Sequence, residues 1–424
     1  MRKQLLLTTV MVMLAIMAHA QKYVGGDISL LTQYETHGTK YFDENGNSIP
    51  NMLQYFKGQG LNSMRVRLFV DPSNASAEDK GQGVCQDLEY VKALGKRIKD
   101  AGMTLMLDFH YSDSWADPVK QWTPKAWQSL SDEQLYTKIY EYTKDVLSQM
   151  KAAGATPDFI QTGNEISYGM LWGTSNSNAK KADPGNPTNW NRFMKLLGQA
   201  AKACREECPQ AKIIIHTELV RNLSLLKSYY NAVTTDYDII GLSYYPYYHG
   251  YLKQLENALN TMKNDHPDKE IMIVETGYYY AWQPTDGVKY DYSGTYPITP
   301  AGQQAFTKAL IELLNGYDQV TGLYWWMMEA SENGLDWNTK RVTDGWYNAS
   351  LFNDSSTDTG WPAGKVMPAM QELKNFLEGS AGISATVVDT PETATWYTID
   401  GRRLNAKPTT RGLYIHDGKK IIIN

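Results

Sequence analysis

Two glutamates in this chain each stand at the end of a short apolar run. Glu165 closes the segment TGNE, and Glu275 lies in the segment IVETG. A carboxylate at the end of a buried strand costs free energy unless it is paired or has a function. Hydrolysis of a glycosidic bond needs a proton for the leaving oxygen and an electron pair for the anomeric carbon, and retaining enzymes take both from two carboxyl groups about 5–5.5 Å apart. Such proximity also raises the pKa of one carboxyl group, which keeps a proton available near neutral pH. The pair is therefore a candidate catalytic site.

Short apolar runs alternate with longer helical patterns through the middle of the chain, which favours a parallel sheet built from βα units. The runs that we predict as strands are residues 26–31, 63–70, 104–110, 159–165, 212–218, 238–246, 270–278 and 320–327. The stretches that we predict as helices include residues 88–101, 131–153, 190–207, 252–266 and 299–315. Eight strands with helices between them predict an α/β fold of the (β/α)8 TIM-barrel class. The chain lacks the glycine-rich phosphate loop, GxGxxG or GxxxxGK[ST], that is typical of a doubly wound open sheet.

In such a barrel the C-terminal ends of the strands and the loops after them carry the chemistry. Polar and aromatic residues gather at those ends, namely Asp27, Arg65, Arg67, Asp108, His110, Asn164, His216, Glu218, Tyr244, Tyr245 and Trp326. The short polar side chains can orient the carboxylates, bind sugar hydroxyl groups or make purely structural hydrogen bonds; the sequence leaves these roles open for Asp27, Asp108, His110 and His216. Trp115 follows the third strand, where an exposed ring can stack on a sugar. One of Tyr244 and Tyr245 can donate to a carboxylate or a ring oxygen while the other faces the core.

The two ends of the chain differ in composition from the middle. Residues 1–20 combine a basic start, an apolar run and a small-residue cleavage site, which is the pattern of a secretory signal peptide. The run is shorter than the roughly 20 apolar residues of a membrane span, so we expect an exported protein (periplasmic, cell-surface or extracellular) with no transmembrane segment. We expect residues 21–379 to form the catalytic domain, 380–394 a linker, and 395–424 a small β-hairpin tail. The tail resembles C-terminal segments of exported Bacteroidetes proteins; an extra hairpin packed on the barrel is the alternative.

Composition narrows the class of partner. The chain has 29 Tyr and 12 Trp against 9 Phe, and a ring with a polar tip suits a wet groove better than a dry core. The balance therefore favours a carbohydrate ligand. A formal net charge of −5 with no basic stripe argues against nucleic acid. Three cysteines are too few for a disulfide framework and have no metal-ligand spacing, so we expect free thiols. We also expect no required cofactor and a monomer.

Several longer segments resemble glycoside hydrolase family 53, and the resemblance extends from about residue 23 to residue 375. The segments are GGDIS at 25–29, MRVRLFVDP at 64–72, LDFHYSDSWADPVKQWTPKAW at 107–127, GNEISYGMLW at 163–172, IIGLSYYPYYHG at 239–250, VETGY at 274–278 and YPITPAGQ at 296–303. The string DFHYSDSWADP is highly specific, whereas a lone NE or ET dipeptide would not be.

The resemblance implies a retaining endo-β-1,4-galactanase that cuts β-1,4-galactan, as in type I arabinogalactan and pectin. It implies that Glu165 is the acid/base and Glu275 the nucleophile. It also implies that Asn164 hydrogen-bonds the sugar's 2-hydroxyl group and that Arg67 lies near the nucleophile and helps hold it ionised. Some members of the family hold a structural calcium near strands seven and eight. This chain has no clear ligand cluster there, although acidic residues are available at positions Asp286, Asp291, Asp336, Asp344 and Asp354.

The chain departs from the family pattern at two places along the groove. Tyr248 stands where the family has tryptophan, and strand eight ends in Trp325-Trp326-Met327-Met328 where the family has Tyr-Trp-Glu-Pro. These departures bear on substrate length and subsite preference rather than on the reaction.

Two other functions are open to the sequence. Other β-glycanases and exo-acting β-galactosidases of the same clan share the barrel and the two carboxylates. A carbohydrate-binding protein without catalysis is a different class, and it predicts a substituted carboxylate, whereas both glutamates are present here with their neighbours.

Overall fold

The computed structural model describes residues 21–174, 177, 179–282, 288–330, 347–354 and 362–378, together with 396–398, 403–404, 408–410, 412–416 and 419–423. By its internal contacts the chain divides into two units, with the boundary between residues 385 and 386. The predicted signal peptide, residues 1–20, and the predicted linker, residues 380–394, lie outside the described residues.

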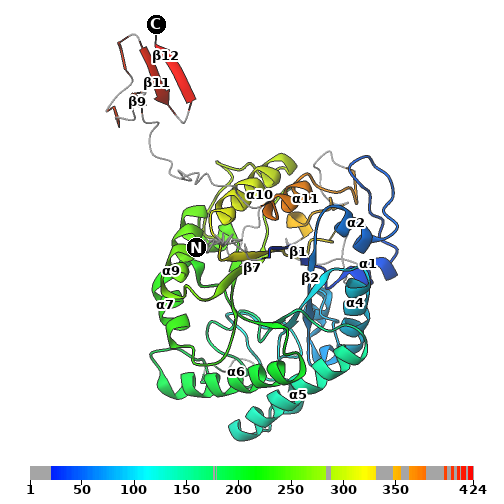
Figure 1. The fold of residues 1–424 in the computed structure, drawn as a ribbon. Helices are drawn as coiled ribbons and strands as arrows, with labels where there is room; N and C mark the ends of the chain where they lie inside the picture. The colour runs from blue at the N-terminus through cyan, green and yellow to red at the C-terminus, as the bar shows by residue number, and fades with distance from the viewer. Residues whose placement is uncertain are drawn as a thin grey trace, which may run out of the picture. The chain divides into compact units, whose positions relative to one another are not determined.

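The larger unit is a closed barrel of eight parallel strands, as Figure 1 shows. The strands are β1 (Tyr23–Asp27), β2 (Ser63–Leu68), β3 (Thr104–Phe109), β4 (Phe159–Gln161), β5 (Lys212–Thr217), β6 (Ile239–Tyr244), β7 (Glu270–Thr276) and β8 (Val320–Trp325). Each strand pairs with the next, and β8 pairs with β1. Every residue of β2, β6 and β8 is buried, as expected for strands covered on both faces. The predicted TIM-barrel class is confirmed.

Helices follow the strands and form the outer ring of the barrel (Figure 1). The helices are α1 (Leu31–Thr36), α2 (Met52–Gly58), α3 (Ala77–Gly81), α4 (Leu88–Asp100), α5 (Asp132–Ala152), α6 (Pro187–Glu207), α7 (Leu223–Ala232), α8 (Pro246–His249), α9 (Leu252–Asp265), α10 (Pro300–Asn315) and α11 (Ala369–Glu372). Their starts follow ordinary capping chemistry: Ser131 and Gln134 form a reciprocal capping box at the start of α5. The five predicted helices correspond to α4, α5, α6, α9 and α10. Within the described residues, no helix has the length and apolar content needed to cross a membrane.

All eight strands end earlier than the apolar pattern predicts, and the two largest differences, in β1 and β4, shape the site. β1 ends at Asp27 because the Asp27 carboxylate accepts the N–H of Ser29 at 3.0 Å and turns the chain out of the sheet. β4 ends at Gln161 because Gly163 and Glu165 have φ values of 117° and 45°. Positive φ is incompatible with an extended strand, so the chain leaves the sheet there and Glu165 belongs to the loop.

The smaller unit holds four strands in the order β10-β9-β11-β12, all antiparallel. The strands are β9 (Trp396–Thr398), β10 (Arg403–Leu404), β11 (Gly412–His416) and β12 (Lys419–Ile423). β9 pairs with β10 and β11 pairs with β12, so each pair spans one of the two Asp-Gly sequences of the segment. The segment predicted as a small hairpin tail therefore contains two hairpins that share one sheet.

Close packing of β1 on β2 leaves no room for a side chain at position 25. An ideal Cβ there would lie 1.7 Å from the carbonyl oxygen of Ser63, a backbone atom of the neighbouring strand. We expect Gly25→Ala to lower the free energy of unfolding by about 3 kcal/mol or more, as measured by urea denaturation. Gly58→Ala is the matched control, because nothing lies within 4 Å of its Cβ position and alanine favours the helix. Equal stability of the two variants would contradict this packing.

Candidate active site

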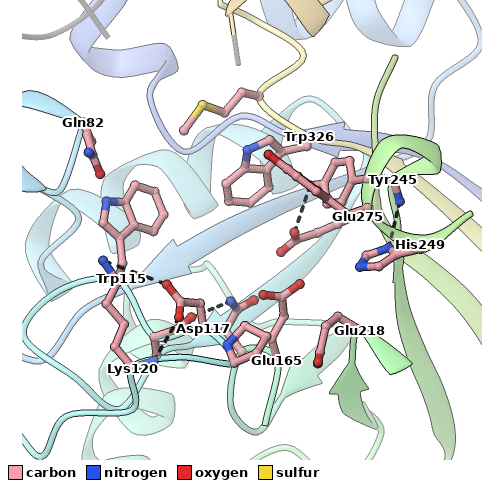
Figure 2. Close-up of a pocket in the computed structure, with 15 residues that line it drawn as sticks. Gln82, Trp115, Asp117, Lys120, Glu165, Glu218, Tyr245, His249, Glu275 and Trp326 are labelled. Carbon is pink, nitrogen blue, oxygen red and sulfur yellow. Dashed lines mark hydrogen bonds and ion pairs between the residues drawn. The ribbon is translucent and has the colours of Figure 1, made fainter. Parts of the chain in front are cut away.

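A cavity of about 320 Å³ lies at the C-terminal end of the barrel, among the loops that follow the strands (Figure 2). Six of the residues predicted for the site line it, namely Trp115, Asn164, Glu165, Tyr245, Glu275 and Trp326. The other lining residues are Gln82, Ala116, Asp117, Pro118, Lys120, Glu218, Tyr248, His249 and Met327.

Glu165 and Glu275 face each other in this cavity, as Figure 2 shows. Glu165 stands in the loop after β4, and Glu275 belongs to β7. The Oγ atom of Ser243 in β6 is 2.7 Å from Glu165 Oε1 and 3.5 Å from Glu275 Oε2. One hydroxyl oxygen therefore contacts both carboxyl groups, so the two predicted carboxylates do form a pair.

The backbone of Glu165 is held in the left-handed region, with a φ of 45°. Such a conformation costs about 1–3 kcal/mol for a residue other than glycine and persists only where the surroundings fix it. Here the N–H of Glu165 donates to Nδ1 of His216 at 3.2 Å, and its carboxyl group is hydrogen-bonded to Ser243 Oγ at 2.7 Å. The loop is thus anchored at both the main chain and the side chain of its functional residue.

Arg65, rather than Arg67, is the cation beside Glu275, which corrects the prediction for Arg67. Arg65 Nη2 lies 2.9 Å from Glu275 Oε1 and 2.8 Å from Asp108 Oδ2, and its Nη1 lies 3.0 Å from Asp27 Oδ2. Arg67 pairs instead with Asp27 at 2.6 Å. Residues two apart in a strand share a face, so both arginines point into the barrel. Sequence spacing alone does not tell which guanidinium reaches β7.

Of the two adjacent tyrosines, Tyr245 reaches the site. Its hydroxyl group donates to Glu275 Oε2 at 2.9 Å (Figure 2). Tyr244 is fully buried, does not line the cavity, and donates to the carbonyl oxygen of Gly250 at 3.0 Å. Of the two roles that the sequence left open for this pair, Tyr245 therefore has the one in the site and Tyr244 the one in the core.

The surroundings of the two glutamates separate their proton affinities. Burial raises the pKa of Glu165 well above its usual value, and the negative charges of Glu275 and Glu218 raise it further. Burial also raises the pKa of Glu275, to about 7, but the Arg65 charge and the Tyr245 hydroxyl group favour its ionised form. As the pH rises, Glu275 is therefore the first of the pair to lose its proton, and Glu165 keeps its proton to higher pH.

Four of the predicted polar residues lie behind the cavity wall rather than on it. Asp27, Asp108, His110 and His216 are each at most 1% exposed, and none of them lines the cavity. Asp27 accepts from Arg65 and Arg67. Nε2 of His110 lies 3.1 Å from Asp108 Oδ2, and its Nδ1 accepts the N–H of Ala116. Among the roles that the sequence left open for these four residues, this placement favours the orienting and structural ones.

Two indole rings line the cavity next to Arg67. The Arg67 guanidinium carbon lies 4.9 Å from the ring centroid of Trp115 and 4.8 Å from that of Trp326. The two ring centroids are 6.1 Å apart. Cation–π contacts at such distances are attractive, so Arg67 holds the two aromatic rings of the cavity in place.

Two further carboxyl groups line the cavity. Glu218, after β5, accepts a hydrogen bond from Ser167, and burial raises its pKa to about 7. Burial also raises the pKa of Asp117, which lies 3.9 Å from Nζ of Lys120. The sequence does carry a signal for Glu218, which shares the inward face of its segment with His216 at a spacing of two residues. Asp117 lies in a loop, where no periodicity indicates its direction.

The described residues do not fit a metal site. Within them, no group of three or more histidine, cysteine or acidic side chains could hold a metal ion. Of the acidic residues considered for calcium, Asp291 and Asp354 are described, whereas Asp286, Asp336 and Asp344 lie outside the described residues.

Most of the length of the chain is similar to known proteins. Residues 23–371 match the sequence profile named "Glycosyl hydrolase family 53". Arabinogalactan endo-beta-1,4-galactanase A of Aspergillus niger is 32% identical over 319 residues, which cover 72% of this chain and 85% of that protein. The endo-beta-1,4-galactanase of Bacillus subtilis is 28% identical over 362 residues, 81% of this chain and 80% of that protein. A solved structure, the "Ignisphaera aggregans GH53 catalytic domain", superposes with a TM-score of 0.70 at 30% identity and covers 83% of this chain and 95% of that chain.

Removal of the Arg65 charge should destabilise the fold in a pH-dependent way. Arg65→Met leaves Asp27, Asp108 and Glu275 without their shared cation, so we expect the free energy of unfolding near pH 8 to fall by about 3–5 kcal/mol. The Glu275 contribution to this loss disappears as the pH falls through about 7, because a protonated carboxyl group no longer needs the cation. Burial by itself would raise the pKa of Asp108, but the Arg65 charge and the contact with His110 together outweigh burial and lower it, so its share persists to more acidic pH.

The measurement is urea denaturation of the variant and the wild type near pH 8 and near pH 5. Arg97→Met is the matched control, because Arg97 forms a paired contact with Glu35 at the surface, and such pairs contribute about 1 kcal/mol or less. A loss for Arg65→Met no greater than that of Arg97→Met would contradict the central role of Arg65.

Proposed function

The chain belongs to glycosyl hydrolase family 53, and from this premise we propose that it is a retaining endo-hydrolase of β-1,4-galactosidic bonds in galactan and type I arabinogalactan. The observation that carries the proposal is the pair of glutamates facing each other in one cavity, one placed to keep its proton and the other to lose it. The names of the Aspergillus niger and Bacillus subtilis relatives supply the substrate.

The proposed reaction is a double displacement. Glu165 gives its proton to the leaving oxygen while Glu275 attacks the anomeric carbon and forms a galactosyl ester. Glu165, now ionised, takes a proton from water, and that water displaces Glu275 with a second inversion. The contact of a single Ser243 hydroxyl group with both carboxyl groups supports this mechanism, because retaining pairs stand about 5–5.5 Å apart and inverting pairs about 6.5–9.5 Å.

Charge moves between the glutamates during this reaction, and their surroundings suit the direction of movement. Arg65 and the Tyr245 hydroxyl group keep Glu275 ionised and point one of its oxygens in a fixed direction. Glu165 lies close to the negative charges of Glu275 and Glu218, which favour its protonated form before the first step. Once Glu275 is esterified, one of these charges is gone, and Glu165 can ionise more easily.

Asn164 and the two indole rings are the proposed contacts of the sugar. Asn164 Oδ1 accepts from Arg65 at 2.9 Å and Nδ2 donates one N–H to the carbonyl oxygen of Ala116 at 2.8 Å, which fixes the amide plane. An amide carries two N–H groups, so the second can donate to the 2-hydroxyl group of the sugar. Trp115 and Trp326 present rings on which the C–H face of a galactose unit can stack.

We also propose that the protein is exported and acts as a monomer. The pattern of residues 1–20 supports export. The site residues described above all come from one chain, so catalysis requires no second copy.

The substrate is tested by comparing β-1,4-galactan, β-mannan and cellulose. We expect galactan alone to be cut, with a rapid fall in polymer size before short products accumulate, as an endo-acting enzyme requires. Chromatography of the products over time measures both properties. Preferred cleavage of mannan or cellulose would favour another β-glycanase of the same clan, and release of galactose alone from chain ends would favour an exo-acting β-galactosidase.

The roles of the two glutamates are tested by substitution and azide rescue. We expect Glu275→Ala and Glu165→Ala each to lower kcat by at least about 1,000-fold on galactan, because each removes a group that acts in the transition state. With an activated aryl β-galactoside, azide should give the α-galactosyl azide with Glu275→Ala, from one inversion, and the β-galactosyl azide with Glu165→Ala, from two. Exchanged azide stereochemistry would reverse the assignment, and α-configured first products of the wild type, read by proton NMR, would exclude retention.

A further inference from the structure

Ser243 occupies a position between the two glutamates that none of the roles above explains. It belongs to β6, is fully buried and does not line the cavity. Its Oγ atom lies 2.7 Å from Glu165 Oε1, 3.5 Å from Glu275 Oε2 and 2.8 Å from Nε2 of His216. A hydroxyl group has one proton to give and two lone pairs to receive, so the direction of each hydrogen bond decides what Ser243 can do.

The surroundings of His216 fix those directions. Its Nδ1 faces the backbone N–H of Glu165 at 3.2 Å, and a backbone N–H can only donate, so Nδ1 accepts. Burial lowers the pKa of His216 well below its usual value, which keeps the ring neutral. The ring proton is therefore on Nε2 and is donated to Ser243 Oγ. The Ser243 proton is left for a carboxylate.

The imidazole is itself anchored from the far side. Gln161, the last residue of β4, places Nε2 at 2.8 Å from His216 Nδ1 and at 2.6 Å from Asp108 Oδ1. A chain of contacts thus leads from Asp108 through Gln161 and His216 to Ser243. Asp108 also pairs with Arg65, so this chain of contacts connects Ser243 to the same cation that pairs with Glu275.

We propose that Ser243 is a positioning residue that gives its single proton to whichever catalytic glutamate is ionised, and that His216 holds it between the two. The inference rests on the proposed double displacement. In the free enzyme the protonated Glu165 donates to Ser243 Oγ, and the hydroxyl group donates its own proton to the Glu275 carboxylate. After attack, Glu275 is an ester and Glu165 is ionised, so the hydroxyl group turns about its Cβ–Oγ bond and donates to Glu165. Hydrolysis of the ester returns it to Glu275, and no bond to Ser243 forms or breaks at any step.

Removal of the hydroxyl group should slow both half-reactions. We expect Ser243→Ala to lower the rates of galactosyl-enzyme formation and of its hydrolysis by about 10- to 100-fold each, the usual effect of a hydrogen bond to a charged group. Single-turnover and steady-state rates with an aryl β-galactoside separate the two steps. KM should change by no more than about twofold, because Ser243 is outside the cavity wall. Ser243→Cys, which keeps the size but is a weak donor, should show losses in the same direction.

The pH dependence distinguishes this role from a merely structural one. Donation to an ionised carboxyl group lowers its pKa, so Ser243→Ala should move the acidic limb of the pH–rate profile, which Glu275 sets, to higher pH. The other groups that act on Glu165 are Glu275, Glu218 and Asp117, and those that act on Glu275 are Arg65, Asp108, Tyr245 and Asp27. The substitution leaves all of these in place. NMR titration of the Glu275 carboxyl carbon reads the same shift without substrate, so it tests the inference even if galactan proves not to be the substrate of the wild type.

Ser63→Ala is the matched control for the loss of a buried serine. Ser63 is a fully buried residue of β2 whose Oγ lies 2.7 Å from the Tyr324 hydroxyl group, away from the cavity. We expect this variant to lose stability but to keep wild-type rates and an unchanged pH profile. Unaltered rates in Ser243→Ala, slowing of only one half-reaction, or an equal effect of Ser63→Ala would overturn the inference.

Discussion

The rest of this site depends on one buried positive charge. Arg65 is fully buried at the centre of the barrel, with Asp27, Asp108 and Glu275 within 3.0 Å of its guanidinium nitrogens. Each carboxylate would cost several kcal/mol to bury alone, and the shared cation offsets that cost for all three. The planar guanidinium group also fixes where each oxygen lies. A lysine could neutralise one partner, but it could not hold three carboxylates and the amide of Asn164 in fixed directions.

The order of the strands explains how Arg65 is connected to both glutamates. Arg65, Asp108, Gln161, His216, Ser243 and Glu275 come from β2, β3, β4, β5, β6 and β7 respectively. Each of these strands is the neighbour of the next in the closed sheet, so contacts between adjacent strands are enough to connect the two sides of the site. Glu165 is the exception. It has left the sheet, and its left-handed backbone is tied back to this array through His216.

Much of this arrangement can be predicted from the sequence, and the missing part has a physical cause. The barrel follows from eight apolar runs, and the glutamate pair follows from the position of two carboxylates at the ends of such runs. Periodicity says which face a residue takes but not how far its side chain reaches, so the sequence cannot choose between Arg65 and Arg67 as the partner of Glu275. Ser243 is a small residue inside an apolar strand, and only the positions of His216 and the glutamates give it a role.

The charge of the cavity bears on the kind of sugar that it accepts. Asp117, Glu165, Glu218 and Glu275 all line the cavity, whereas the cations Arg65 and Arg67 lie behind its wall and are engaged with carboxylates there. Among the described residues that line the cavity, Lys120 is the one lysine or arginine, and it lies near Asp79 and Asp117. An acidic sugar would bring one more negative charge into this space and would raise the cost of ionising Glu275. From the described residues we therefore expect the cavity to favour a neutral polysaccharide such as galactan over the galacturonate backbone of pectin, because the carboxyl groups that keep a proton on Glu165 would also repel an acidic sugar.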